Sequence, residues 1–592
     1  MNYQLDLPEE NKQKLNSLDL IKSLYRFIKG SRLMFAVAFV FLLINSATTI
    51  IVPFLTGDVT NKYLPTGDKE NLLKAVALIA LIYMVGSVAS YFQIRTMGRV
   101  GQSILFRIRN AIFEKIQSLP LAFFNANKSG DLISRINNDT EKMNQAFSET
   151  ILRFTGDIVV IIGIGVAMLA LNPQLGSIAW IVLAIMLLIT WGLSGWIKTR
   201  NDASLQKLGE LSGQIQESLS NFKVTVVFNR RDYFRNSFHK VNQENQRAAT
   251  LTGIANGMLV PLYNYAAAVG TVLILVFGIQ ILLLDKIAAG VMPEFGSLLT
   301  FILYANIFFN PLKEMAELFA QVQTAIASWT RINKILRLEN NLQQLDIPDQ
   351  DSSTALMRFH NVSFGYDPEN IVINKINMEL EAGKTYALVG PTGGGKSTTA
   401  SLMARLYDIS EGQIFFKGRD IRTYSADELA SQIGFILQEP FMFLGTLADN
   451  IKYGNDALAD YSEEQLTDKL NTLGLEKLIS RFPEGLATSI SAGAENISLG
   501  QKQLVAFVRI LLRTPKLLIL DEATANVDTV TEALLEEILG KLPADTTKVI
   551  IAHRLNTIED ADQIFFIANG SIEKPMDFKS ALHLIETSKG KS

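Results

Sequence analysis

Six long apolar runs fill most of the first 330 residues and limit the possible folds more than any other feature. They lie near residues 33–56, 72–94, 150–171, 175–197, 256–284 and 295–320. Each run is long enough to cross the roughly 30 Å hydrocarbon layer of a bilayer as a helix. The stretch from Ile178 to Ile189 is apolar on every side, which is not the pattern of an amphipathic helix in a soluble core. We therefore expect an all-α membrane domain with six spans.

Lysine and arginine concentrate in the connections after the second and fourth runs, over residues 95–149 and 198–255. The connections at 172–174 and 285–293 are short, and Lys286 is the only basic residue in them. Since basic loops stay on the cytoplasmic side, both long connections and both termini are predicted to be cytoplasmic. No short apolar stretch with a cleavage site precedes the first run, so we expect no removed signal peptide. We expect a multi-pass protein of the plasma (inner) membrane.

The long connections carry apolar residues at helical spacing. In the first connection these continue the second span without a break to Leu119, so a helix from Leu72 to Leu119 would be about 70 Å long. The bilayer takes up roughly 30 Å of that length. The fourth-to-fifth connection repeats the pattern through Leu219, and the sixth helix is expected to continue to Ile332. The sequence thus predicts long cytoplasmic helical extensions.

A glycine-rich loop, Gly390–Thr398, marks the second half of the chain. It follows Tyr386–Val389, which is typical of a buried strand, and precedes Thr399–Leu406, which is predicted to be a helix. This is the phosphate-binding pattern G-x-x-x-x-G-K-[ST] in its strand–loop–helix setting. Lys396 is expected to reach the β- and γ-phosphates of ATP, and Ser397 to ligate Mg²⁺. The predicted nucleotide-binding residues of this loop are Gly390, Pro391, Thr392, Gly393, Gly394, Gly395, Lys396, Ser397 and Thr398.

Two residues outside the loop are further candidates for the nucleotide site. Tyr366 lies just upstream of the loop, and an aromatic ring there either stacks on adenine or belongs to the core. Gln438 follows an apolar strand and either meets Mg²⁺ or the attacking water, or has no such role.

Two more candidates follow apolar strands near the C-terminal end. The apolar run Leu517–Leu520 ends in Asp521 and Glu522, and carboxylates at the end of a buried strand are costly without a function. Asp521 is expected to hold Mg²⁺ and Glu522 to orient or deprotonate water, unless Glu522 is an ordinary loop acid. His553 either contacts the γ-phosphate or is structural. The predicted catalytic residues are Glu522, His553 and Gln438, and the predicted metal ligands are Ser397, Gln438 and Asp521.

Composition sets further limits. A chain of 592 residues is too long for one compact domain, and the net charge of −3 gives no reason to expect a nucleic-acid partner. The absence of cysteine excludes disulfides and thiolate metal sites. The expected domains are a cytoplasmic segment (1–32), a membrane domain (33–332), a linker (333–356) and an α/β nucleotide-binding domain (357–592).

The stretch Asn496–Gln503 is similar to the LSGGQ signature of ATP-binding cassettes, and Ala525–Asp528 resembles their D-loop. Residues 123–139 resemble the exporter stretch that holds the first coupling helix. With these motifs the chain resembles an ABC exporter half-transporter over nearly its whole length. The implied fold is a six-helix membrane domain followed by an α/β P-loop cassette.

The resemblance implies that two such subunits sandwich two ATP molecules. Ser498, Gly500 and Gln501 would then serve the ATP held by a second half-transporter. Whether the dimer is a homodimer or a heterodimer stays open. Leu499 replaces the first glycine of the signature, so either function is retained despite this change or the bulky side chain weakens the partner's site.

The expected function is ATP-driven export, or flipping, of an amphipathic drug-like, lipid or peptide substrate across the bilayer by alternating access. The alternative is an ATP-dependent regulator of a partner channel or complex. Polar residues within the spans are expected to line a substrate cavity. Glu314 and Glu317 share a helix face and either attract amphipathic cations or lie below the membrane with Lys313 and solvent.

Overall fold

The computed structural model describes residues 3, 5, 17–340, 342, 344–346, 353–367, 370–521, 529–551, 559–572 and 579–580. The chain divides into two compact units. The helical unit comprises residues 5–117 and 129–337, and the α/β unit comprises residues 1–4, 118–128 and 338–592.

Among its described residues, the helical unit contains six segments that are long and apolar enough to cross a membrane, as the sequence predicts. These segments are Ser23–Lys62, Lys69–Gln117, Ser129–Leu171, Pro173–Ser220, Arg231–Ala288 and Phe295–Leu312. The helices of this unit are α1 (Ser17–Ile28), α2 (Arg32–Lys62), α3 (Lys69–Gln117), α5 (Ser129–Ser134), α6 (Thr140–Gln145), α7 (Ile151–Leu171), α8 (Pro173–Ser220), α9 (Phe222–Val227), α10 (Arg231–Gly257), α11 (Leu259–Gly278), α12 (Asp285–Ala288) and α13 (Phe295–Leu336). Single π-helical turns at 135–139, 146–150 and 279–284 join some of them.

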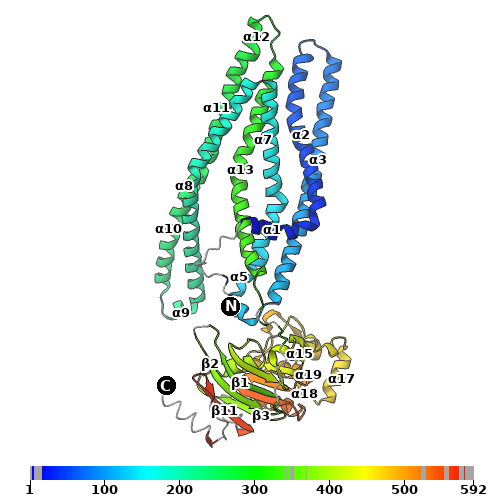
Figure 1. Cartoon of the computed structure of the whole chain (residues 1–592), viewed down its shortest axis with the longest axis vertical. Helices are drawn as coiled ribbons and strands as arrows, with labels where there is room; N and C mark the ends of the chain where they lie inside the picture. The colour runs from blue at the N-terminus through cyan, green and yellow to red at the C-terminus, as the bar shows by residue number, and fades with distance from the viewer. Residues whose placement is uncertain are drawn as a thin grey trace. The chain divides into compact units, whose positions relative to one another are not determined.

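Several helices are much longer than a bilayer is thick. Helix α3 has 49 residues and α8 has 48, so each extends for about 70 Å at 1.5 Å per residue. The predicted unbroken helix after the second apolar run is therefore present, and α13 likewise continues to Leu336. In Figure 1, α2 and α3 run together on one side of the unit and α8 and α10 on the other, with α7 and α13 between them.

The tight connection between α7 and α8 follows from its sequence. The side chain of Asn172 accepts hydrogen bonds from the backbone N–H groups of Gln174 (3.0 Å) and Leu175 (3.2 Å). Pro173 occupies the first helical position, where its missing N–H costs nothing. This N-cap starts the fourth span directly after the third.

The core of the helical unit gathers around α13. Its residues Phe301, Tyr304, Phe308 and Phe309 are almost fully buried against α7, α8 and α11. Trp180 of α8 joins this cluster, since its ring meets Phe308 edge-on and its indole N–H donates to the carbonyl of Gly165. Trp180 is thus a packing residue of the bundle.

The described part of the α/β unit contains two larger sheets. The four-stranded antiparallel sheet has the order β2-β1-β4-β5, with β1 (Met357–Phe364), β2 (Ile373–Leu380), β4 (Glu411–Phe416) and β5 (Arg419–Asp420). The six-stranded sheet has the order β12-β11-β3-β10-β9-β6, with β3 (Thr385–Val389), β6 (Ile433–Ile436), β9 (Leu517–Asp521), β10 (Thr547–Ile551), β11 (Gln563–Ala568) and β12 (Ser571–Ile572). A small pair is formed by β7 (Gly445–Thr446) and β8 (Ser489–Ile490).

The described helices of the α/β unit are α4 (Leu121–Ala126), α14 (Lys396–Met403), α15 (Ala426–Gln432), α16 (Leu447–Lys452), α17 (Glu463–Thr472), α18 (Glu476–Ile479), α19 (Leu499–Arg513) and α20 (Thr529–Gly540). Of these, α14, α15 and α19 contact strands of the six-stranded sheet. Figure 1 shows α17, α18 and α19 grouped to one side of the strands. A second core there contains Leu504, Phe507 and Leu511 of α19 together with Leu518 and Leu520 of β9.

The pairing of the strands shows which edge of the six-stranded sheet carries the candidate functional site. Strands β3, β10, β9 and β6 are parallel, and Ile551 pairs with both Leu388 and Asp521. Their carboxyl ends therefore meet along one edge of the sheet, where open α/β sheets bind their ligands.

Candidate functional site

The phosphate-binding loop leaves the sheet after Val389 and enters α14 at Lys396. The structure starts this helix three residues before the predicted Thr399 and ends it at Met403 instead of Leu406. The earlier start places Lys396 and Ser397 in the first helical turn, whose backbone N–H groups have no partner within the helix. A helix N-terminus of this kind favours anionic groups.

Glycine is required in this loop by close packing against β11. Gly390 has φ +141°, and a Cβ built on it would lie 2.0 Å from the carbonyl oxygen of Ile567. A Cβ on Gly394 would lie 2.6 Å from the same oxygen. Gly395, the N-cap of α14, has φ +110°, which side chains rarely adopt. The loop can hold this shape only with glycine at these points.

Lys396 points back into the loop. Its side chain is buried, and its Nζ donates to the carbonyl oxygens of Gly390 and Pro391, each over 2.9 Å. The loop backbone thus fixes the position of a compact positive charge, which suits recognition of a phosphate.

Ser397 and Asp521 come together although 124 residues separate them, with Ser397 Oγ 3.5 Å from Asp521 Oδ1. Both offer hard oxygen atoms at the edge of the sheet. Mg²⁺ keeps several waters and needs only one or two protein oxygens beside the phosphates. The hydroxyl of Ser397 and the carboxylate of Asp521 are therefore oxygen ligands of the kind that could hold the ion.

Gln438 lies on the same edge. Strand β6 ends at Ile436, which pairs with Leu520, and Gln438 follows two residues later with an exposed side chain. Glu522, His553 and the stretch Ala525–Asp528 lie outside the described residues.

Tyr366 is 57% exposed, so it does not belong to the core. Its hydroxyl lies 3.2 Å from Thr398 Oγ1 in the first turn of α14. Its ring meets Phe364 and Tyr407 edge-on, each with a centroid separation of 5.1 Å. The exposed face is therefore held beside the loop by packing from behind.

Tyr407 was not predicted as part of this site. It follows α14 closely in the chain, and its hydroxyl accepts a hydrogen bond of 2.5 Å from Asn125 of α4. No local sequence pattern predicts this contact, because the two residues are 282 positions apart.

The signature stretch begins α19. Ser498 is the N-cap: its Oγ accepts from the N–H of Gln501, and the Gln501 Oε1 accepts from the N–H of Ser498. Gln501 also donates its Nε2 to the carbonyl of Arg481. Leu499 and Gly500 are the first helical residues and are half-buried. Gln501 therefore stabilises the start of the helix. Leu499 occupies the position at which the LSGGQ signature has its first glycine.

Comparison with known proteins identifies the family. Residues 35–312 match the ABC transporter transmembrane region, and residues 373–525 match the ABC transporter family. The chain is 30% identical over 579 residues to the uncharacterized ABC transporter ATP-binding protein YfiC of Bacillus subtilis (strain 168), covering 96% of this chain and 94% of that one. The chain belongs to the ABC transporter family.

Two further relatives of this ABC transporter have more specific names. An ATP-dependent lipid A-core flippase of Syntrophus aciditrophicus (strain SB) is 30% identical over 561 residues, 94% of this chain and 91% of the relative. A probable multidrug resistance ABC transporter, YheH, of Bacillus subtilis (strain 168) is 29% identical over 508 residues, 84% of this chain and 74% of the relative. The predicted resemblance and fold class are confirmed: the protein is a multi-pass membrane protein of the exporter type with an ATP-binding domain and ATPase activity coupled to transport.

Proposed function

We propose that this ABC transporter is one half of a dimeric exporter that moves an amphipathic lipid-like or drug-like molecule across the bilayer by alternating access. The proposal rests on one observation: the chain combines six segments that could cross a membrane with one phosphate-binding loop. At that loop Ser397 lies beside Asp521. The names of the flippase and multidrug relatives support amphipathic substrates. Peptides remain the third class of the proposal.

In the proposed cycle Lys396 and the loop backbone hold the ATP phosphates, and Ser397, Asp521 and Gln438 surround Mg²⁺. The ion would neutralise charge on the phosphates when bound. Glu522 orients or deprotonates the attacking water, His553 contacts the γ-phosphate, and Tyr366 stacks on adenine. The buried Lys396 ammonium and the exposed face of Tyr366 support the roles given to those two residues.

A second copy or a different half-transporter completes the nucleotide site. Ser498, Gly500 and Gln501 at the start of α19 would face the partner's ATP, because the first N–H groups of a helix favour anions. The interlocked cap of Ser498 and Gln501 gives this helix start a fixed shape. Leu499 leaves both a homodimer and a heterodimer open.

Cytoplasmic termini and an inner-membrane location are also part of the proposal. One basic connection begins within α3, and the other begins within α8 and continues into α10. Basic connections of this kind stay on the cytoplasmic side. The chain has no cysteine, so a single introduced cysteine is the only thiol that a reagent can label. Two separate variants test the orientation, one with a cysteine at exposed Lys128 and one with a cysteine at exposed Gly290. A membrane-impermeant maleimide added to intact cells should label Gly290→Cys and spare Lys128→Cys; the reverse pattern would refute the orientation.

One observation favours substrates with a cationic group. Asp157 of α7 lies in a membrane-crossing segment, and its Oδ2 is buried with no hydrogen-bond partner among the described residues. Glu314 of α13 adds a second acidic group to its surroundings, and Arg153 of α7 partly offsets the negative charge. A carboxylate in a span is costly and usually functional. The side chain of Glu317 lies outside the described residues. Two other polar residues of the spans have partners: Tyr263 contacts Thr190, and Asn256 pairs with Asn201.

Reconstitution into vesicles tests the function. ATP-dependent accumulation of a fluorescent lipid or of ethidium, absent in Glu522→Gln, supports an exporter. ATP hydrolysis without flux of any lipid, drug or peptide in the panel would favour the regulator. If cationic groups are recognised, Asp157→Asn reduces ethidium transport several-fold and leaves a zwitterionic fluorescent lipid unaffected. Purification of the chain alone settles the dimer type, since an inactive monomer requires a different partner.

A further inference from the structure

The short helix α4 belongs to the α/β unit, whereas α3 before it and α5 after it belong to the helical unit. It has six residues, and Phe123 is its fully buried anchor. A helix of this length is not stable by itself, so its position depends on tertiary contacts. Asn127 closes its end by donating Nδ2 to the carbonyl of Phe123 over 2.7 Å.

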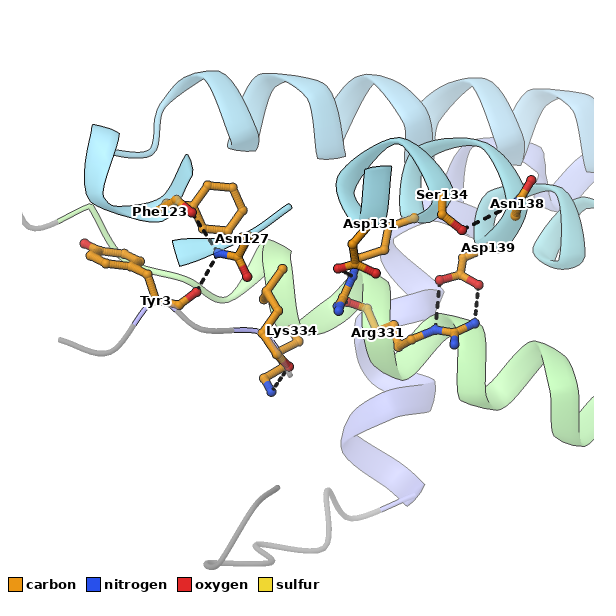
Figure 2. Close-up of polar contacts among 11 residues, drawn as sticks. Tyr3, Phe123, Asn127, Asp131, Ser134, Asn138, Asp139, Arg331 and Lys334 are labelled. Carbon is orange, nitrogen blue, oxygen red and sulfur yellow. Dashed lines mark hydrogen bonds and ion pairs between the residues drawn. The ribbon is translucent and has the colours of Figure 1, made fainter. Parts of the chain in front are cut away.

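Tyr3 packs against α4 from a distant part of the chain. Its side chain is only 4% exposed, and its ring meets that of Phe123 edge-on with centroids 6.5 Å apart. Asn127 Nδ2 also donates to the backbone oxygen of Tyr3 over 2.9 Å, as Figure 2 shows. One amide group therefore joins the end of α4 to Tyr3.

The hydroxyl of Tyr3 makes a third contact. It donates to the carbonyl oxygen of Glu339 over 3.1 Å, in the stretch that follows α13. Tyr3 thus connects α4 to the beginning of the segment that leads to β1. Leu5, two residues later, is also 4% exposed, and its carbonyl accepts from Lys334 of α13 over 2.6 Å within the helical unit.

Another residue of α4, Asn125, connects this helix to the candidate nucleotide site. Asn125 donates to the Tyr407 hydroxyl over 2.5 Å, and the Tyr407 ring meets the ring of Tyr366 at 87°. Tyr407 also packs on Phe364 with a centroid separation of 5.6 Å. The ring contact and the hydrogen bond therefore form a continuous path from Tyr366 through Tyr407 to Asn125.

We propose that Tyr3 is a positioning residue that holds α4 so that Asn125 engages Tyr407, and that nucleotide binding at Tyr366 reaches α4 only while Tyr3 is docked. The inference rests on the proposed function, because it takes Tyr366 as the adenine contact. It assigns to a residue ahead of α1 a part in passing the nucleotide signal to the segment between α3 and α5.

The absence of cysteine permits a direct test in the full-length protein. Ala126→Cys, at the exposed end of α4, carries an environment-sensitive fluorophore in nanodisc-reconstituted transporter. The response of this label to MgATP is compared in four backgrounds: Tyr3→Ala, Tyr3→Phe, Asn125→Ala and the double variant Tyr3→Ala/Asn125→Ala. ATP affinity and melting temperature are measured for each.

We expect Tyr3→Ala and Asn125→Ala each to reduce the MgATP-induced signal at least threefold while ATP affinity stays within twofold. The double variant should be no worse than Asn125→Ala, since both changes break one connection. Tyr3→Phe should keep most of the signal, because the ring and the backbone contact with Asn127 remain.

Three results would overturn the inference: a full signal in Tyr3→Ala, additive losses in the double variant, or no MgATP response at residue 126 in the parent. A melting temperature and ATP affinity that both fall in Tyr3→Ala would show a general structural role and also reject it. If the parent protein binds no ATP, the proposed function itself fails. Normal ATP binding with a signal independent of Tyr3 rejects only the inference.

Discussion

Arg331 of α13 holds Asp139 through its guanidinium group, although 192 residues separate them. Its Nε donates to Oδ2 over 2.9 Å, and a second guanidinium nitrogen pairs with Oδ1 (Figure 2). The Asp139 side chain is 4% exposed, whereas that of Arg331 is 49% exposed. Arg135, itself buried beside them, donates to the Arg331 carbonyl and pairs with Asp131.

The two halves of this ion pair should respond differently to mutation. Arg331→Ala leaves a buried carboxylate without its partner, which costs about 3–5 kcal/mol. Asp139→Asn keeps a hydrogen-bond acceptor and leaves a half-exposed guanidinium that water can solvate, so we expect a loss of about 1–2 kcal/mol. Thermal unfolding of the detergent-solubilised protein measures both. Equal losses would contradict the asymmetry.

Two glycines of the phosphate-binding loop should differ in their tolerance of alanine. At Gly390 the new Cβ would meet the rigid backbone oxygen of Ile567 at 2.0 Å, while at Gly393 (φ +79°) it would meet nothing within 4 Å. We expect Gly393→Ala to cost about 1–2 kcal/mol from its left-handed conformation alone. Gly390→Ala should cost clearly more. The comparison is made by thermal unfolding without nucleotide, and a smaller loss in Gly390→Ala would be inconsistent with the packing.

The Ser397–Asp521 pair predicts a specific dependence on magnesium. Ser397→Ala and Asp521→Asn should each raise the MgCl₂ concentration for half-maximal ATPase activity, by roughly tenfold if one ligand contributes about 1.4 kcal/mol. Removal of Mg²⁺ with EDTA should stop hydrolysis reversibly. Ser401→Ala is the matched control, because that hydroxyl donates to the Ser397 carbonyl one turn further along α14. An unchanged Mg²⁺ requirement in both site variants would remove them as ligands.

Arg509 joins α19 to the stretch that follows Gln438. It donates to the carbonyl of Phe441 and to the side chain of Asn450, each over 2.8 Å, and lies 5.6 Å from the Tyr453 ring. Burial lowers the pKa of its guanidinium to about 10, so the group stays charged at neutral pH. Lysine lacks the planar fork of donors, so Arg509→Lys should cost about 2–4 kcal/mol of stability.

The matched control for Arg509 is Arg419→Lys, at an exposed arginine beside Tyr424. That change should stay within about 0.5 kcal/mol. Chemical denaturation followed by far-UV circular dichroism would be compared for both variants. A loss in Arg509→Lys no larger than in the control would show that the fork of donors is not needed.

Leu499 gives a prediction about the paired nucleotide sites. Leu499→Gly restores the glycine of the signature at the first position of α19, where the helix tolerates it. In a homodimer we expect ATPase activity to rise at least threefold, because both sites gain room near the phosphate, with Leu499→Ala between the two. Steady-state ATPase assays of the purified chain check this. Unchanged or lower activity would mean that Leu499 does not limit the site.

The nucleotide loop was largely predictable from sequence because its shape depends on neighbouring residues. Gly390 and Gly395 adopt backbone angles that favour glycine, and the strand before them is a short buried run. The helix start at Lys396 was placed three residues too late, since the loop glycines obscured where helical geometry begins. The roles proposed for Glu522 and His553 stay predictions from sequence.

By itself, the sequence determined the six spans, the long helix α3 and the strand–loop–helix of the cassette. These features are local: a span must satisfy its backbone within its own helix, and its length is read directly from the apolar run. Only the tertiary structure decided that α4 joins the α/β unit, that Tyr366 is exposed, and that Asp139 meets Arg331 and Asn125 meets Tyr407. Those pairs are 192 and 282 residues apart, so packing of whole elements brings them together and no local pattern encodes the contact.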